Sequence, residues 1–195
     1  MSHLNATIEL IVFKNRTVFI FLLFVNLPLI IFTWNTGNWS DDYQLLNLFF
    51  TKQSISPFSR IVLDIIETRV DGHFIPAYYF INTLIYKIYP SLQFFHFIIV
   101  LCHIGTAFMV FMIVVHTHNN RKVALLSGVL FSLSYCVCIK ALAWNCFHSH
   151  VTNTFTGVIA LYFALQYFKH ERRIYLLYIF LFVLVSIHNM ESGFA

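Results

Sequence analysis

Charged residues are scarce in this chain of 195 residues: Asp, Glu, Lys and Arg make up only 10%, against about a quarter in an ordinary soluble domain. The net charge of +4 is small and scattered, which disfavours nucleic acid as a partner. Glycine and cysteine are also rare, and they form neither a phosphate-cradling loop nor a CxxC pair. These absences exclude a soluble globular enzyme, a disordered chain and a disulfide-stapled secreted domain.

Apolar residues make up 59% of the sequence, which is typical of a polytopic membrane protein whose surface faces lipid. Five runs approach the ~20 residues that a helix needs to cross a bilayer: residues 17–34, 92–115, 123–143, 151–168 and 174–189. The first run is too long for a signal peptide and no cleavage site follows it. We therefore predict an all-α integral membrane protein with about five transmembrane helices. Residues 35–91 would form a large external loop of surface helices.

Basic residues indicate which side each loop faces. They cluster before the first run and between later runs, as Lys14 and Arg16, Arg121 and Lys122, and Lys169, Arg172 and Arg173. The positive-inside rule then predicts a cytoplasmic N-terminus and an active face outside. As the membrane we expect a bacterial cytoplasmic membrane rather than the endoplasmic reticulum. This alternation requires that residues 73–89 do not cross. We predict a buried external helix or re-entrant segment there, opened by Pro76.

Two adjacent acids, Asp41 and Asp42, follow the first run. Ser40 can cap a helix that begins there, and carboxylates in a first helical turn stay ionised at neutral pH. Such a pair can bind a divalent cation or accept a proton from an attacking hydroxyl. The alternative is that both are ordinary first-turn acids at a membrane surface.

Polar side chains inside the runs have two interpretations. His96 and His103 are seven residues apart and share a helical face, which favours hydrogen bonds to neighbouring helices over a metal pair. A stripe of small residues on the fourth run predicts close helix packing: Asn153, Gly157, Ala160 and Ala164.

Several short motifs occur in a characteristic order: WSDDYQLL (39–46), DGHFIPAYYF (71–80), FFHFIIVLCHIGTAFM (94–109), VLFSLSYCVCIKALAW (129–144) and HNMESG (188–193). This order resembles the N-terminal half of GT-C glycosyltransferases, particularly the protein O-mannosyltransferase group and its bacterial relatives. Three positions depart from the family pattern. Ile75 replaces a frequent Arg, Lys140 replaces an acid, and Met190 replaces a Lys.

The resemblance implies an inverting enzyme that transfers a sugar from a polyprenyl-phosphate donor to a protein, lipid or glycan acceptor. It assigns the first-loop acids, Asp41 and Asp42, as catalytic base or metal ligands. Donor and substrate binding then falls to residues of the external segments, Arg60, Arg69, His73 and Glu191, and to Lys140 near the outer end of the run 123–143. Arg60 and Arg69 can instead pair only with nearby acids on their own helix.

Family members have more membrane spans than this chain, so residues 1–195 are expected to be the N-terminal portion of a multi-pass domain. An active enzyme and an inactive fragment are both compatible with that expectation. Two other classes are open, namely a non-catalytic membrane assembly subunit and a transporter fragment. A transporter would need charges along an intramembrane path, whereas the runs contain almost none.

Overall fold

The computed structural model describes residues 15–35, 59, 76–134 and 148–189. Within these ranges the chain forms seven α-helices and no strand, which confirms the predicted all-α class. The helices are α2 (Asn15–Val25), α3 (Leu27–Asn35), α6 (Pro76–Ile88), α7 (Leu92–His118), α8 (Arg121–Leu133), α10 (His148–His170) and α11 (Arg173–Asn189).

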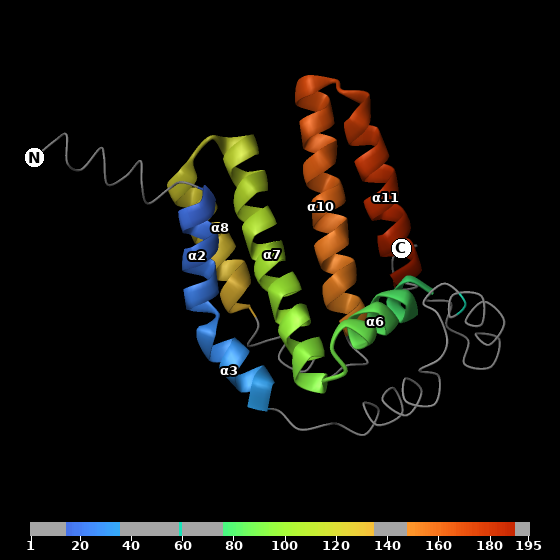
Figure 1. The fold of residues 1–195 in the computed structure, drawn as a ribbon. Helices are drawn as coiled ribbons and strands as arrows, with labels where there is room; N and C mark the ends of the chain where they lie inside the picture. The colour runs from blue at the N-terminus through green and yellow to red at the C-terminus, as the bar shows by residue number, and fades with distance from the viewer. Residues whose placement is uncertain (1–14, 36–58, 60–75, 135–147, 190–195) are drawn as a thin grey trace, which may run out of the picture.

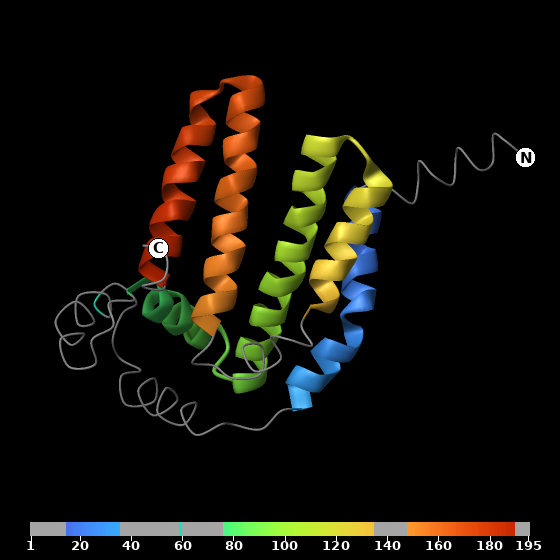
Figure 2. The ribbon, with the colours of Figure 1, turned by 180° about the vertical axis from the view of Figure 1, so that it is seen from behind.

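The longest described helix, α7, lies at the centre of the bundle (Figure 1). Helices α2, α3 and α8 pack against one side of α7, α10 packs against the other, and α11 lies beyond α10 (Figure 2). The sequence of α7 contains 27 residues and no Asp, Glu, Lys or Arg. At 1.5 Å per residue it is about 40 Å long, and it can therefore pack against helices along its whole length.

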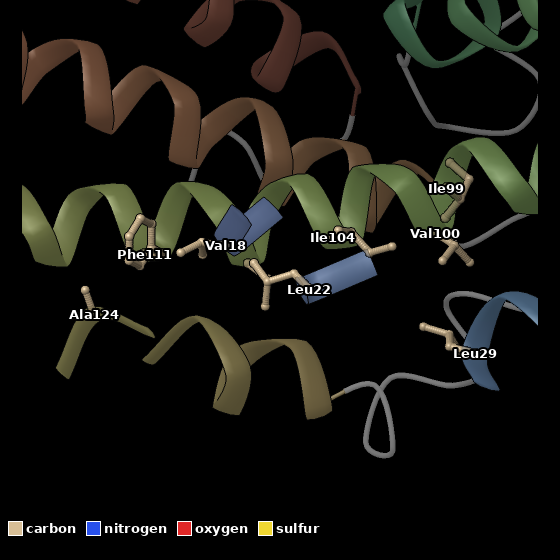
Figure 3. Close-up of a cluster of buried hydrophobic side chains, with 9 residues drawn as sticks. Val18, Leu22, Leu29, Ile99, Val100, Ile104, Phe111 and Ala124 are labelled. Carbon is tan, nitrogen blue, oxygen red and sulfur yellow. The ribbon is translucent and has the colours of Figure 1, made fainter. Parts of the chain in front are cut away.

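Apolar side chains from four helices meet in one core (Figure 3). Leu22 of α2, Ile104 of α7 and Ala124 of α8 are all fully buried there. Leu29 extends the core onto α3, and Phe111 closes it near the α7–α8 turn. Truncating such large buried side chains costs about 2–5 kcal/mol in well-packed proteins, so this core joins the N-terminal helices firmly to α7 and α8.

The first predicted span is not one continuous helix. The chain bends by 48° between α2 and α3, and Asn26 lies at the break. Pro28 explains the bend, because proline has no N–H to donate and its ring clashes with the carbonyl four residues earlier, that of Phe24. This corrects the prediction of a single helix over residues 17–34.

The other predicted runs correspond to helices with shifted ends. Helix α7 extends three residues beyond the predicted 92–115, and α10 extends the predicted 151–168 at both ends. Both stop at a residue in the left-handed conformation, Asn119 (φ 51°) and Glu171 (φ 52°). Such residues commonly terminate helices. Helix α8 covers the first part of the run 123–143, and the rest lies outside the described residues.

Glycines allow α7 to approach both of its long neighbours. A Cβ atom on Gly128 of α8 would lie 3.0 Å from the Ala107 carbonyl oxygen and 3.3 Å from Phe111 Cβ. A Cβ atom on Gly105 of α7 would lie 2.7 Å from the Phe155 ring of α10. Small residues of this kind let helix backbones come close together, and here they set the spacing of α8, α7 and α10.

Among the described helices, α7 is the one that is long and apolar enough to cross a membrane by itself. The bent pair α2 and α3 becomes a second if both halves form one span. Helix α11 is apolar but shorter than the length required. The predicted count of about five spans is therefore not confirmed by helix length and composition.

Candidate functional site

The predicted site residues all lie outside the described residues. They are Asp41, Asp42, Arg60, Arg69, His73, Lys140 and Glu191. The site can therefore be located only through the helices that flank these segments, and those helices are described.

The flanking helices converge on one end of the bundle (Figure 1). Helix α3 ends there at Asn35, six residues before Asp41. Helix α11 ends there at Asn189, two residues before Glu191. Six extended residues reach at most about 20 Å, which limits the chain length available between Asn35 and Asp41. Three further helices also have one terminus here: α6, α7 and α10.

Helix α6 lies across this end of the bundle instead of alongside the long helices (Figure 2). It begins at Pro76, as predicted, since proline suits a first helical position. Its buried face packs on α7, where the Tyr86 and Phe95 ring centroids are 6.3 Å apart. Tyr89, which follows α6, is exposed and contacts Phe94 edge to face at 5.5 Å.

Polar atoms also occur on the buried face of α6. Asn82 and Thr83 are both buried, and the Thr83 hydroxyl has no hydrogen-bond partner among the described residues. At the start of α10, partial desolvation lowers the pKa of the exposed His150 below its usual value because it disfavours the charged imidazolium. This end therefore combines an exposed aromatic ring, that of Tyr89, with the buried polar side chains of Asn82 and Thr83.

The opposite end of the bundle carries the basic residues. Figure 1 shows the start of α2, the α7–α8 turn and the α10–α11 turn together there. Six exposed cations belong to these elements: Arg16, Arg121, Lys122, Lys169, Arg172 and Arg173. Glu171 is the one acid within the described ranges. The fold thus brings Arg16 and the two later basic clusters to one end of the bundle, opposite the C-terminal ends of α3 and α11.

The two histidines inside α7 hydrogen-bond to neighbouring helices. His96 Nδ1 lies 3.0 Å from the Thr33 carbonyl oxygen of α3, and His103 Nε2 lies 3.0 Å from the Ser132 carbonyl oxygen of α8. Both side chains are buried. The predicted interhelical hydrogen bonds are confirmed. No cluster of three metal-binding side chains occurs in the described part of the chain, so His96 and His103 gain no third ligand there.

A polar contact at the α2–α3 break was not predicted from the sequence. Asn26 is fully buried, and its side-chain nitrogen donates to the Leu22 carbonyl oxygen at 2.7 Å and to the Ser132 hydroxyl. Its side-chain oxygen has no hydrogen-bond partner among the described residues. An amide two residues before a proline in an apolar run was the available signal.

Two residues of the small-residue stripe on α10, Asn153 and Gly157, contact α11, which fits the predicted helix packing. The Ser186 hydroxyl of α11 hydrogen-bonds to the Asn153 side-chain oxygen. It also lies 3.8 Å from the position of a Cβ atom on Gly157. Phe163 continues the contact by packing on the Tyr178 ring at 4.8 Å. Close packing therefore accounts for the stripe.

Comparison with known proteins gives no assignment of function. No family model, curated protein or solved structure matches this chain. The proposal that follows is based on the geometry of the bundle and on the sequence motifs.

Proposed function

We propose that the chain is a multi-pass membrane protein of about five spans, with its basic end in the cytoplasm. The outward faces of its long helices are strongly apolar. Large exposed side chains occur on α2, α8, α10 and α11, including Phe24, Leu130, Phe168 and Phe180. In water such a surface would favour aggregation, whereas lipid is its natural solvent.

The shorter helices fit this proposal when the chain outside the described ranges is counted. Helices α2 and α3 together cover 15–35 with one break, and broken helices occur in membranes where neighbouring groups satisfy the freed backbone. Asn26 and Ser132 place polar groups at this break. Helix α8 begins a longer apolar run that continues to residue 143 in the sequence.

The separation of charge between the two ends is the observation that carries the proposal. Six cations and one acid lie at the end with the helical turns. Helices α3 and α11, which precede in sequence the stretches with six of the eight acids, both end at the opposite end. Positively charged loops are retained in the cytoplasm, so the end opposite the basic turns would face outward.

We further propose that the outer end transfers a sugar from a polyprenyl-phosphate donor. A lipid-linked donor stays in the membrane plane, so its sugar reaches protein groups at the interface. Asp41 would accept the proton of an acceptor hydroxyl as that oxygen attacks the anomeric carbon. The carbon–oxygen bond to phosphate then breaks, and polyprenyl phosphate leaves with the electron pair.

Other residues of the outer segments would hold the two substrates. Arg60, Arg69 and Lys140 supply positive charge for the donor phosphate. His73 and Glu191 would contact the sugar or the acceptor, which is a protein, lipid or glycan. Asp42 would bind a divalent metal ion or orient the loop. The support for these roles is the position of the flanking helices and the resemblance to GT-C enzymes.

A transporter is the second candidate, because one observation favours it. Broken helices with buried polar groups line substrate paths in many transporters, and the α2–α3 break places Asn26 beside Ser132. Against it, α7 carries no formal charge along its 27 residues. Flux of ions or sugars through reconstituted vesicles of the wild-type chain would support this alternative.

The enzymatic proposal can be tested with substitutions at the acidic pair. The chain is expressed in bacterial membranes, and transfer of radiolabelled mannose from polyprenyl-phosphate mannose to acceptors is measured. A general base contributes about 10²–10⁴-fold, so Asp41→Asn should abolish measurable transfer. Asp42→Glu should retain part of the activity, because its charge and its metal-binding oxygens remain.

Glu171→Gln is the matched control, since it removes an acid at the opposite end and should leave transfer unchanged. Membrane insertion is checked for each variant by resistance to carbonate extraction. Full activity in Asp41→Asn together with loss of activity in Asp42→Glu would reverse the assigned roles. Absence of transfer by a well-inserted wild-type chain would favour the assembly subunit or an inactive fragment.

A further inference from the structure

The turns α7–α8 and α10–α11 have the same construction. Each joins two helices through two residues, and the first of these is in the left-handed conformation. The amide of that residue donates to the carbonyl oxygen four residues earlier, from Asn119 to Val115 at 3.0 Å and from Glu171 to Tyr167 at 2.7 Å. Each turn therefore presents a short, tightly closed loop at the basic end of the bundle.

Matching residues recur at a spacing of 52 in the two hairpins. The pairs share residue type and place: Gly105 and Gly157, Phe111 and Phe163, His118 and His170, and Arg121 and Arg173. A histidine thus ends the first helix of each hairpin, and an arginine begins the second. Because both hairpins have an arginine at the equivalent position, the positive charge is a repeated feature of the two turns.

The two turns form one surface because α7 and α10 are in contact just below them. Gln166 of α10 lies 3.5 Å from His116 of α7, side-chain nitrogen to side-chain nitrogen. Figure 1 and Figure 2 both show the turns on the same end of the bundle. The basic surface contains five cations from the turns, Arg121, Lys122, Lys169, Arg172 and Arg173, together with Arg16 of α2.

Exposed apolar side chains lie directly next to these cations. Val123 follows Lys122 and is 47% exposed, and Ile174 follows Arg173 and is 46% exposed. Phe168 precedes Lys169 and is 78% exposed. A partner that matched only the charge would leave this collar of apolar groups exposed to water. Phospholipids match both parts, because their phosphates attract cations and their acyl chains contact the apolar collar.

We propose that the basic surface binds the headgroups of anionic phospholipids in the cytoplasmic leaflet. The proposal depends on the membrane placement argued above and adds a lipid preference to it. Each Lys or Arg near an anionic membrane surface strengthens binding by up to about five-fold. The surface therefore selects anionic over zwitterionic lipids and fixes the depth of both hairpins in the bilayer.

The test uses the full chain in phosphatidylcholine vesicles that contain a trace of spin-labelled lipid. Electron paramagnetic resonance gives the association constant of spin-labelled phosphatidylglycerol relative to spin-labelled phosphatidylcholine. The wild-type chain should prefer phosphatidylglycerol, and high salt should weaken the preference. The double variants Arg121→Gln/Lys122→Gln and Arg172→Gln/Arg173→Gln should each lower it by about two-fold or more.

Three controls make the result specific. Lys87→Gln removes an exposed cation at the opposite end and should leave the preference unchanged. Arg172→Lys/Arg173→Lys keeps the charge and should also leave it unchanged. Glu171→Gln removes the acid and should raise the preference for phosphatidylglycerol. Misfolding would not produce such an increase.

Equal association of the two lipids with the wild-type chain would overturn the inference, as would an equal loss in Lys87→Gln. Carbonate extraction separates this failure from that of the membrane placement. A chain that resists extraction but shows no lipid preference contradicts only the lipid site. A chain that carbonate releases contradicts the membrane placement, and the lipid site with it.

Discussion

Asn26, His96 and His103 show how single polar residues fix the positions of apolar helices. His96 bonds to a carbonyl oxygen of α3 and His103 to one of α8, so both tie α7 to its neighbours. Their role was predictable, because a polar group at membrane depth needs a partner. Asn26 was not predicted, because its partner Ser132 lies 106 residues away in the chain.

Glu171 provides a prediction at the residue scale. Its φ of 52° is costly for most residues with a Cβ atom, whereas Asn119 in the equivalent turn belongs to a type that tolerates this region. Glu171→Gly should therefore raise the free energy of unfolding by about 0.5–1 kcal/mol. Asn119→Gly should change it by much less. Thermal unfolding in detergent measures both.

Glu171→Gln separates the effect of losing the charge from the effect of relieving the left-handed backbone conformation. That variant removes the acid but keeps a Cβ atom, so it should not reproduce the gain. An equal gain in Glu171→Gln would assign the effect to charge repulsion or attraction at the basic end. A larger gain in Asn119→Gly would contradict the conformational argument.

At the scale of helices, the sequence predicted which helices form better than it predicted where a helix is interrupted. Runs of apolar residues located α7, α10 and α11 to within a few residues. The break between α2 and α3 was missed because hydropathy counts Pro28 as one residue in an apolar run. The missing N–H and the ring of Pro28 disrupt the preceding turn. This one residue therefore bends the helix, although the run of eighteen residues is apolar overall.

Three glycines at helix crossings give a ranked prediction. Gly128→Ala places a Cβ atom against the α7 backbone, and Gly105→Ala places one against the Phe155 ring. Overpacking of this kind costs about 1–3 kcal/mol. Gly157→Ala meets its nearest neighbour at an ordinary 3.8 Å and gains helix propensity, so it should be neutral or stabilising.

Unfolding of the three variants in detergent tests this order. Gly157→Ala is the internal control, because it makes the same chemical change where space is available. Equal destabilisation of all three variants would mean that contact of the added Cβ atom with a neighbouring helix does not cause the loss of stability. A stable Gly128→Ala would show that α7 and α8 are farther apart than described.

For the whole molecule, charge along the chain predicted more than hydropathy did. Alternating runs and basic clusters led to the expectation that Arg16, the 121–122 pair and the 169–173 cluster share one side, and the bundle places them at one end. The central position of α7 and the placement of α6 across the opposite end depend on packing between distant segments. No local pattern encodes those contacts.

The candidate site was predictable only as a set of external segments. The sequence named the acids and cations, and the fold shows which helices lead to them. The distances among Asp41, Lys140 and Glu191 depend on how residues outside the described ranges fold. Local motifs do not contain that information, because each of these residues belongs to a different segment.

In the proposed topology, the two ends of the bundle face opposite sides of a membrane. The most direct test of this topology is cysteine labelling of the full chain in cells, after the four native cysteines are replaced. Cysteines introduced at Asn119 and Glu171, in the two basic turns, should react with a membrane-impermeant maleimide only after the cells are opened. Cysteines introduced at Ser54 and Lys87 should react in intact cells. Equal external labelling at Ser54 and Asn119 would contradict this topology, and the acidic segments would then lose their outer placement.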